Sequence, residues 1–125
     1  MKTVLLVENE EVLRNLVKEL LEIKGYEVLL AVHGAEALNL LQTHDGRIDL
    51  VLTDVNMPQM SGAELAEHVR RDHPSLKVIF ISGAASADNP AISKFLETPG
   101  AAFMQKPFRL SALVSQVEQL LGPEI

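Results

Sequence analysis

Short apolar runs and longer amphipathic stretches alternate along the whole chain. The apolar runs are typical of strands covered on both faces of a sheet, and they occupy residues 3–7, 27–32, 48–53, 76–81 and 101–104. After each run, apolar residues recur at every third or fourth position, which predicts an amphipathic helix. The predicted helices begin near Glu8, Ala35, Ser61, Pro90 and Leu110, and they end near Gly25, Thr43, His73, Leu96 and Leu121.

The first predicted helix shows the amphipathic pattern most fully. Its apolar residues have the spacing of one inward-facing stripe, which comprises Val12, Leu13, Leu16, Val17, Leu20 and Leu21. Glutamates between Glu8 and Glu11 lie in its predicted first turn, where the helix dipole favours negative charge. Gly25 is placed to end this helix.

Capping residues mark the ends of later helices. Ser61 and Glu64 have the spacing of a capping box, in which a serine caps the helix and a glutamate reaches back to the serine. Pro74 is expected to stop that helix. Asn89 and Pro90 have the order of an N-cap and a first helical residue.

Strands that alternate with helices in this order predict an α/β fold of (βα)₅ type, a doubly wound parallel sheet with right-handed crossovers. A length of 125 residues fits one domain, and 47% hydrophobic residues can supply its core. Because no repeat, linker or low-complexity segment divides the sequence, we expect a single domain over residues 1–125 and no output domain in this chain.

The composition excludes several classes of function. Cysteine is absent, which excludes a disulfide framework, a thiol nucleophile and a thiolate metal site. The net charge of −6 makes the chain a poor partner for nucleic acid or an anionic membrane. No apolar run approaches the roughly 20 residues of a membrane span, and the first residues do not resemble a signal peptide. We therefore expect a cytoplasmic location.

Polar residues with chemical potential follow the predicted strands. Glu8 and Asn9 follow the first, Asp54 the third, Ser82 the fourth and Lys106 the fifth. The carboxyl ends of parallel strands share one edge of the sheet, and ligands bind just beyond that edge. The pattern therefore predicts one cleft that holds carboxylates, a hydroxyl and an amine. Asp54, at the end of a buried run, is its expected reactive centre.

At these positions the chain resembles the response-regulator receiver domains of two-component signalling. The resemblance covers essentially the whole chain and rests on four stretches, each at the end of a predicted strand. They are Val-Leu-Leu-Val-Glu-Asn-Glu at 4–10, Leu-Thr-Asp-Val-Asn-Met-Pro at 52–58 with Ser-Gly at 61–62, Ile-Ser-Gly at 81–83, and Phe-Met-Gln-Lys-Pro-Phe at 103–108. The resemblance implies the flavodoxin-like strand order 2-1-3-4-5 of the CheY-like superfamily.

The resemblance also implies transfer of a phosphoryl group from a phosphohistidine to Asp54. A carboxylate is a usable nucleophile, and the acyl phosphate that it forms is labile. Because negative charge approaches negative charge, the reaction needs cations aimed at the phosphoryl oxygens. The family uses Mg²⁺, and its ligand positions here are Glu8, Asn9, Asp54 and the backbone carbonyl of Asn56.

Three further residues take roles by resemblance. Lys106 would bind one phosphoryl oxygen, and Ser82 would donate its hydroxyl to another and move toward it after phosphorylation. Phe103 matches the switch aromatic, which turns inward when the serine moves. The bond between Lys106 and Pro107 is cis in the family.

The implied partners are proteins. A histidine kinase or a histidine phosphotransfer protein would donate the phosphoryl group. An unknown downstream protein would bind the face formed by the fourth helix, the fifth strand and the fifth helix, and a phosphorylation-dependent homodimer is also compatible with the family. The chain is either a single-domain regulator or the receiver of a larger protein, such as a hybrid kinase.

Asn9 departs from the family pattern, in which an aspartate at this position is a direct metal ligand. Loss of one unit charge about 4 Å from the ion would forfeit at most about 4 kcal/mol at an effective dielectric of 20, and solvation changes would offset much of that. Two functions therefore stay open. The chain is a phosphorylated switch with a weakened Mg²⁺ site, or a phosphorylation-independent interaction module with the same fold.

An enzymatic activity beyond self-catalysed phosphorylation and dephosphorylation is disfavoured. An aspartyl-phosphate phosphatase would carry a second aspartate two residues after the nucleophile, and Asn56 occupies that position. The sequence also lacks the G-x-G-x-x-G and P-loop motifs of nucleotide-binding enzymes.

Overall fold

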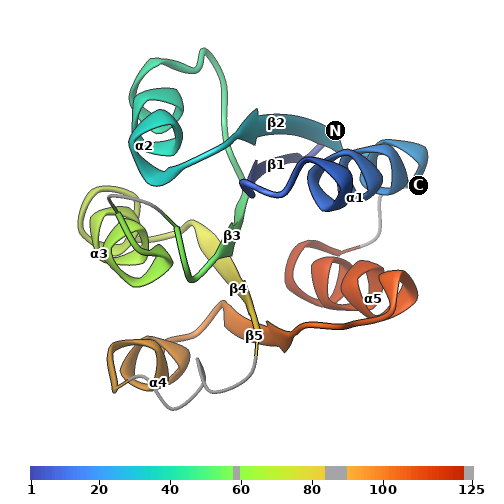
Figure 1. The fold of residues 1–125 in the computed structure, drawn as a ribbon. Coiled ribbons are helices and arrows are strands. Elements are labelled where there is room, and N and C mark those ends of the chain that lie inside the picture. The colour runs from blue at the N-terminus through green and yellow to red at the C-terminus, as the bar shows by residue number, and fades with distance from the viewer. Residues whose placement is uncertain (58–59, 84–89, 123–125) are drawn as a thin grey trace.

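The computed structural model describes residues 1–57, 60–83 and 90–122. Within these residues, strands and helices alternate from β1 to α5, as the sequence predicted (Figure 1). The strands are β1 (Thr3–Val7), β2 (Glu27–Ala31), β3 (Leu50–Asp54), β4 (Lys77–Ser82) and β5 (Ala101–Gln105). The helices are α1 (Glu11–Ile23), α2 (Gly34–Thr43), α3 (Gly62–Asp72), α4 (Pro90–Leu96) and α5 (Leu110–Leu121).

All neighbouring strands are parallel, and their order is β2-β1-β3-β4-β5. This confirms the fold class and the strand order expected from the resemblance. At the carboxyl edge, Val7 of β1 pairs with Thr53 of β3, and the next residue of β3, Asp54, pairs with Ile81 of β4. The register therefore brings the ends of the three central strands to one level.

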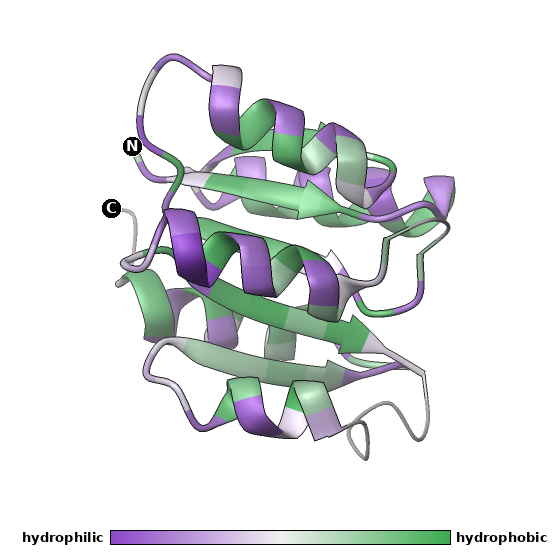
Figure 2. Ribbon diagram, turned by 90° about the vertical axis from the view of Figure 1, so that its left-hand side faces the viewer, coloured by the Kyte–Doolittle hydropathy of each residue, from purple (hydrophilic) through white to green (hydrophobic). Residues whose placement is uncertain are grey.

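Helices cover both faces of the sheet. Helices α1 and α5 lie on one face, and α2, α3 and α4 lie on the other (Figure 1). Successive residues of each strand point to opposite faces of the sheet and form two separate apolar layers. Leu6 and Leu52 pack toward α1 and α5, whereas Leu5 and Val51 pack toward α2 and α3. Figure 2 shows hydrophobic strands beneath helices that are only partly hydrophobic. None of the described helices is long and apolar enough to cross a bilayer.

Helix α1 differs from its prediction at its start and on its surface. It begins at Glu11 instead of near Glu8, because the backbone N–H of Glu8 donates to Ala31 of β2 and its carboxylate accepts from the N–H of Glu10. Val12 and Leu16, which we predicted to face inward, are 70% and 48% exposed. The helix buries a narrower stripe, which includes Val17 and Leu21.

Helix α3 begins where the capping box predicts. The Ser61 hydroxyl accepts from the N–H of Glu64, and the Glu64 carboxylate accepts from the N–H of Ser61. Its first residue, Gly62, lies so close to β3 that an added Cβ would stand 2.5 Å from the carbonyl oxygen of Asp54. Helix α3 is therefore docked directly against the end of the strand that carries Asp54.

The other predicted ends of strands and helices differ from the structure by one or two residues at most. Helix α4 begins at Pro90, as predicted. The prediction that Asn89 caps this helix lies outside the described residues.

Candidate functional site

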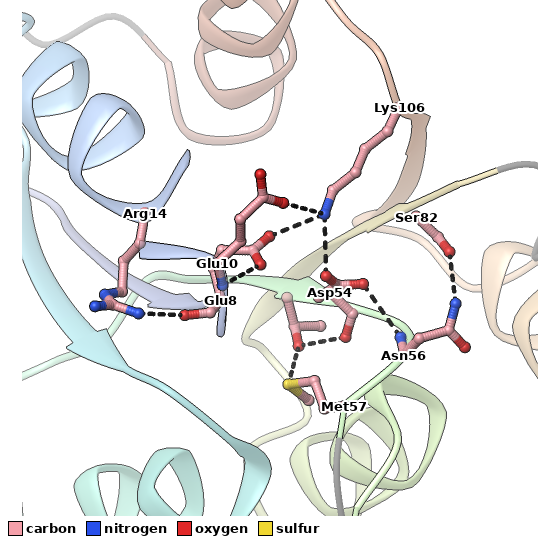
Figure 3. Close-up of polar contacts among 9 residues, drawn as sticks. Glu8, Glu10, Arg14, Asp54, Asn56, Met57, Ser82 and Lys106 are labelled. Carbon is pink, nitrogen blue, oxygen red and sulfur yellow. Dashed lines mark hydrogen bonds and ion pairs between the residues drawn. The ribbon is translucent and has the colours of Figure 1, made fainter. Parts of the chain in front are cut away.

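The centre of the candidate site is a lysine held between two buried carboxylates. Lys106 follows β5, and its Nζ lies 3.1 Å from Oδ2 of Asp54 and 3.2 Å from Oε1 of Glu8 (Figure 3). The Asp54 and Glu8 side chains are only 9% and 2% exposed, whereas that of Lys106 is 25% exposed. Residues from β1, β3 and β5 therefore meet at the carboxyl edge of the sheet, as the sequence predicted.

Within the part of the chain that the structure describes, each carboxylate oxygen of Asp54 accepts one hydrogen bond. Its Oδ2 accepts from Lys106, and its Oδ1 accepts from the backbone N–H of Asn56 at 3.1 Å. A carboxylate oxygen has two lone-pair directions, so each oxygen keeps a second position for another partner. Asp54 is the last residue of β3, and this places its carboxylate at the carboxyl edge of the sheet, in the site that we call the cleft.

Glu8 is anchored by the turn that joins β1 to α1. Its Oε2 accepts from the N–H of Glu10 at 2.9 Å, and Arg14 of α1 donates to its carbonyl oxygen at 3.0 Å. The Glu10 carboxylate is more exposed and lies 3.8 Å from Lys106 Nζ. Lys106 therefore faces three carboxylates, two of which are buried.

The surroundings shift the proton affinities of this group of residues. Burial raises the pKa of the Glu8 carboxyl, and the charge of Asp54 adds to this rise, although the hydrogen bond from Glu10 and the charge of Lys106 oppose it. Burial acts to lower the pKa of Lys106, but its hydrogen bond to Asp54 and the charges of Asp54 and Glu8 outweigh burial and raise it. Lys106 is thus held as a cation next to the carboxylates.

Ser82 and Asn56 form the other side of the cleft. Ser82 ends β4 and is fully buried, and its hydroxyl accepts a hydrogen bond of 3.3 Å from the side-chain amide of Asn56. Phe103 of β5 is half-buried and packs against the apolar layer under α3 and α4. The peptide bond between Lys106 and Pro107 is cis, as the resemblance implied.

Asn9 lies in the same turn as Glu8, but its side chain is exposed. Among the described residues, no group of three or more histidine or acidic side chains is arranged to hold a metal ion. Glu8 and Asp54 nevertheless bring two buried carboxylates beside the partly buried ammonium group of Lys106. Mg²⁺ is commonly held by one or two carboxylates with waters and phosphate oxygens. The residues fit Mg²⁺ as a site with two carboxylates.

A comparison with known proteins identifies the family of this chain. Residues 4–118 match the model of the response regulator receiver domain. The chain belongs to this family. It is 39% identical over 123 residues to the sensor kinase CckA of Brucella abortus, a match that covers 95% of this chain and 12% of CckA. It is 37% identical to the response regulator receiver protein CpdR of the same species, over 97% of this chain and 98% of CpdR.

Solved receiver structures agree with the family assignment. The receiver domain of the hybrid histidine kinase CckA is similar with a TM-score of 0.78 and 34% identity, over 95% of this chain and 98% of that one. The regulator TrrA of Thermotoga maritima, solved in complex with Mg²⁺ and BeF, is similar with a TM-score of 0.81 and 34% identity, over 97% of this chain and 100% of TrrA. Receiver domains of two-component systems generally bind Mg²⁺ at their phosphorylation site.

Two contacts in the cleft were not expected from the sequence. Only the backbone carbonyl of Asn56 was predicted to take part, but the Asn56 side chain also contacts Ser82. Arg14 was not predicted to take part, but it donates a hydrogen bond to the carbonyl oxygen of Glu8. The spacing of Arg14, one helical turn after Glu10, was the available clue, because such a residue points back over the start of its helix.

Proposed function

We propose that this chain is a phosphoacceptor that takes a phosphoryl group onto Asp54 from a histidine kinase or a histidine phosphotransfer protein. The observation that carries the proposal is the position of Lys106 between Asp54 and Glu8, at the meeting point of three strand ends. A nucleophilic carboxylate beside a fixed cation is the arrangement that phosphoryl transfer needs.

In the proposed reaction, a carboxylate oxygen of Asp54 attacks the phosphorus atom of a phosphohistidine. A bond between phosphorus and oxygen forms, and the bond between phosphorus and imidazole nitrogen breaks. Its electron pair stays on the imidazole, which leaves as a neutral group because its other nitrogen carries a proton. Lys106 stays charged and binds a phosphoryl oxygen, and the backbone N–H of Asn56 keeps Asp54 oriented.

Glu8, Asp54 and the backbone carbonyl of Asn56 would hold Mg²⁺, with Asn9 as a further, uncharged oxygen donor. When bound, the ion would neutralise charge on the transferred group. Arg14 and the N–H of Glu10 keep the Glu8 carboxylate turned into the cleft.

We further propose that phosphorylation changes the surface of α4, β5 and α5. Ser82 would move toward the phosphoryl group and Phe103 would turn inward, which would change the affinity of this surface for a downstream protein or for a second copy of the chain. A local charge would thus bias a two-state element.

The test is incubation with acetyl phosphate or phosphoramidate and Mg²⁺, followed by intact mass measurement. The wild type should gain one phosphoryl group, and Asp54→Asn should gain none. Asp45→Asn is the matched control, since Asp45 lies in an exposed turn between α2 and β3, and it should be labelled like the wild type. Equal labelling of Asp54→Asn would exclude Asp54 as the acceptor.

The exposed, uncharged Asn9 favours one second candidate, a phosphorylation-independent interaction module. This function predicts no labelling even by a cognate kinase, and it predicts unchanged partner binding by Asp54→Asn. Phosphotransfer profiling against the histidine kinases of the source organism separates the two functions, because only the phosphoacceptor takes label from a kinase.

A further inference from the structure

Asn56 contacts both the reactive residue and the switch residue of the cleft. Its backbone N–H donates to Oδ1 of Asp54 at 3.1 Å, and its side-chain Nδ2 donates to Oγ of Ser82 at 3.3 Å. Figure 3 shows the Ser82 hydroxyl directed at the Asn56 amide, whereas the other oxygen of Asp54 is directed at Lys106. One residue therefore links the end of β3 to the end of β4.

We propose that the side chain of Asn56 tethers Ser82 in its resting position and so opposes activation of the switch. The inference rests on the proposed function, because activation here means binding of Ser82 to a phosphoryl group on Asp54. To reach that group, the Ser82 hydroxyl must leave the amide that it now contacts. The lost hydrogen bond offsets part of the free energy gained at the phosphoryl group and shifts the population toward the resting state.

The geometry favours a restraint over assistance. An amide that assisted the switch would have to follow Ser82 toward the phosphoryl group. The backbone of Asn56 is held, however, because its own N–H is bonded to Asp54 and the N–H of Val55 donates to the carbonyl of Ile81 at 2.9 Å. The backbone therefore cannot carry the amide along with the hydroxyl, and only a rotation of the Asn56 side chain could do so.

The tether is expected to be modest in strength. Ser82 is fully buried, but Asn56 as a residue is exposed, so water competes for its amide. A single neutral hydrogen bond of this kind corresponds to about a two- to fivefold effect on an equilibrium constant. Removal of the amide should therefore strengthen binding of a phosphoryl mimic by about that factor.

The test is a double-mutant cycle on the affinity for beryllofluoride at saturating Mg²⁺. The variants are Asn56→Ala, Ser82→Ala and the double variant, and Asn56→Ala keeps the backbone N–H and carbonyl of the cleft. The proposal expects Asn56→Ala to raise the affinity about two- to fivefold when Ser82 is present and to leave it unchanged when Ser82 is replaced. Asn39→Ala makes the same change on the exposed side of α2 and should have no effect.

Two results would overturn the tether: a lower or unchanged affinity of Asn56→Ala, or the same gain with and without Ser82. A second readout does not depend on phosphoryl chemistry. In the free protein, the side-chain amide protons of Asn56 should exchange with solvent more slowly than in Ser82→Ala, and equal exchange overturns the tether. If the wild type binds no beryllofluoride, the proposed function fails, while the exchange rates still decide whether the tether exists.

Discussion

Among single residues of the cleft, Lys106 partly neutralises the charge of two buried carboxylates. Its Nζ lies within 3.2 Å of both Glu8 and Asp54. Removal of the lysine charge would leave two buried carboxylates that are poorly solvated and have lost their cationic partner. This lowers the free energy of unfolding more than loss of an exposed ion pair does.

We predict that Lys106→Met lowers the free energy of unfolding by about 1–3 kcal/mol in the absence of divalent ions. The loss should be smaller when Asp54→Asn is also present, because one of the two uncompensated charges is then gone. Urea denaturation of the four proteins of this cycle measures both effects. Lys18→Met is the control, because Lys18 pairs with Glu22 on the surface of α1, and its loss should cost only about 0.3–0.5 kcal/mol. Additive losses in the cycle would contradict direct coupling between Lys106 and Asp54.

Asn9 is the residue at which the chemistry of the cleft departs from the family pattern. A carboxylate at this position would add a charged oxygen donor to Glu8 and Asp54. Because the Asn9 side chain is exposed, solvent screens much of the gain, and we expect about a tenfold rise in Mg²⁺ affinity for Asn9→Asp. Calorimetric titration with Mg²⁺ measures the rise. Asn15→Asp adds the same charge on the exposed side of α1. An equal rise in Mg²⁺ affinity for Asn15→Asp would show that the effect comes from the net charge of the protein and not from a ligand at position 9.

Among the residues of the cleft, those that lie at the end of a strand could be predicted from the sequence. Asp54 and Lys106 follow apolar runs, and parallel strands carry such residues to one edge whatever the details of the loops. The side-chain contact between Asn56 and Ser82 depends on the conformation of the turn after β3, which no periodicity encodes. The cis bond before Pro107 could likewise be expected only from resemblance.

At the scale of elements, the contact of α3 with the end of β3 holds Asp54 in position. The N–H of Gly62 donates to the carbonyl of Val55 at 2.8 Å, and a Cβ at Gly62 would stand 2.5 Å from the Asp54 carbonyl oxygen. The carbonyl groups of Asp54 and Val55 belong to the backbone, so they cannot rotate out of the way as a flexible side chain could. The helix can dock this closely only because its first residue has no side chain.

We predict that Gly62→Ala lowers the free energy of unfolding by about 1–3 kcal/mol, the range typical of overpacking. Gly83→Ala is a matched control at the same edge of the sheet, because a Cβ there meets no atom of the described residues within 4 Å. The free energy of unfolding of this control should stay within about 1 kcal/mol of the wild-type value. Chemical denaturation measures both variants, and equal stabilities would show that α3 moves away at little cost.

The elements themselves could be predicted well, with one informative error in α1. Continuous apolar runs located the buried strands, and the Ser61 capping box located the start of α3. The predicted start of α1 was wrong because Glu8 has the sequence position of a first-turn glutamate. In the structure, Glu8 instead forms hydrogen bonds with Ala31 and Lys106 and lies in the cleft. The predicted burial of Val12 and Leu16 was wrong, because spacing alone does not show how wide a stripe of the helix the neighbouring elements will cover.

At the scale of the whole molecule, the cleft is built by residues from both ends of the sequence. Glu8 lies after the first strand and Lys106 after the last, and Asp54 lies between them on the central strand. The cleft exists only when β1, β3 and β5 are all in place, so it is absent from the unfolded chain. A ligand that binds the cleft must therefore stabilise the entire fold.

We predict that beryllofluoride with Mg²⁺ raises the midpoint of thermal unfolding. At a ligand concentration 100 times the Kd, the native state gains about 2.7 kcal/mol, which for a domain of this size corresponds to roughly 10 °C. Asp54→Asn should show no such shift, because the mimic needs the Asp54 carboxylate, and Asp45→Asn should shift like the wild type. Circular dichroism during heating measures all three proteins. A shift of equal size in Asp54→Asn would place the binding outside the cleft and would contradict the role assigned to the strand ends.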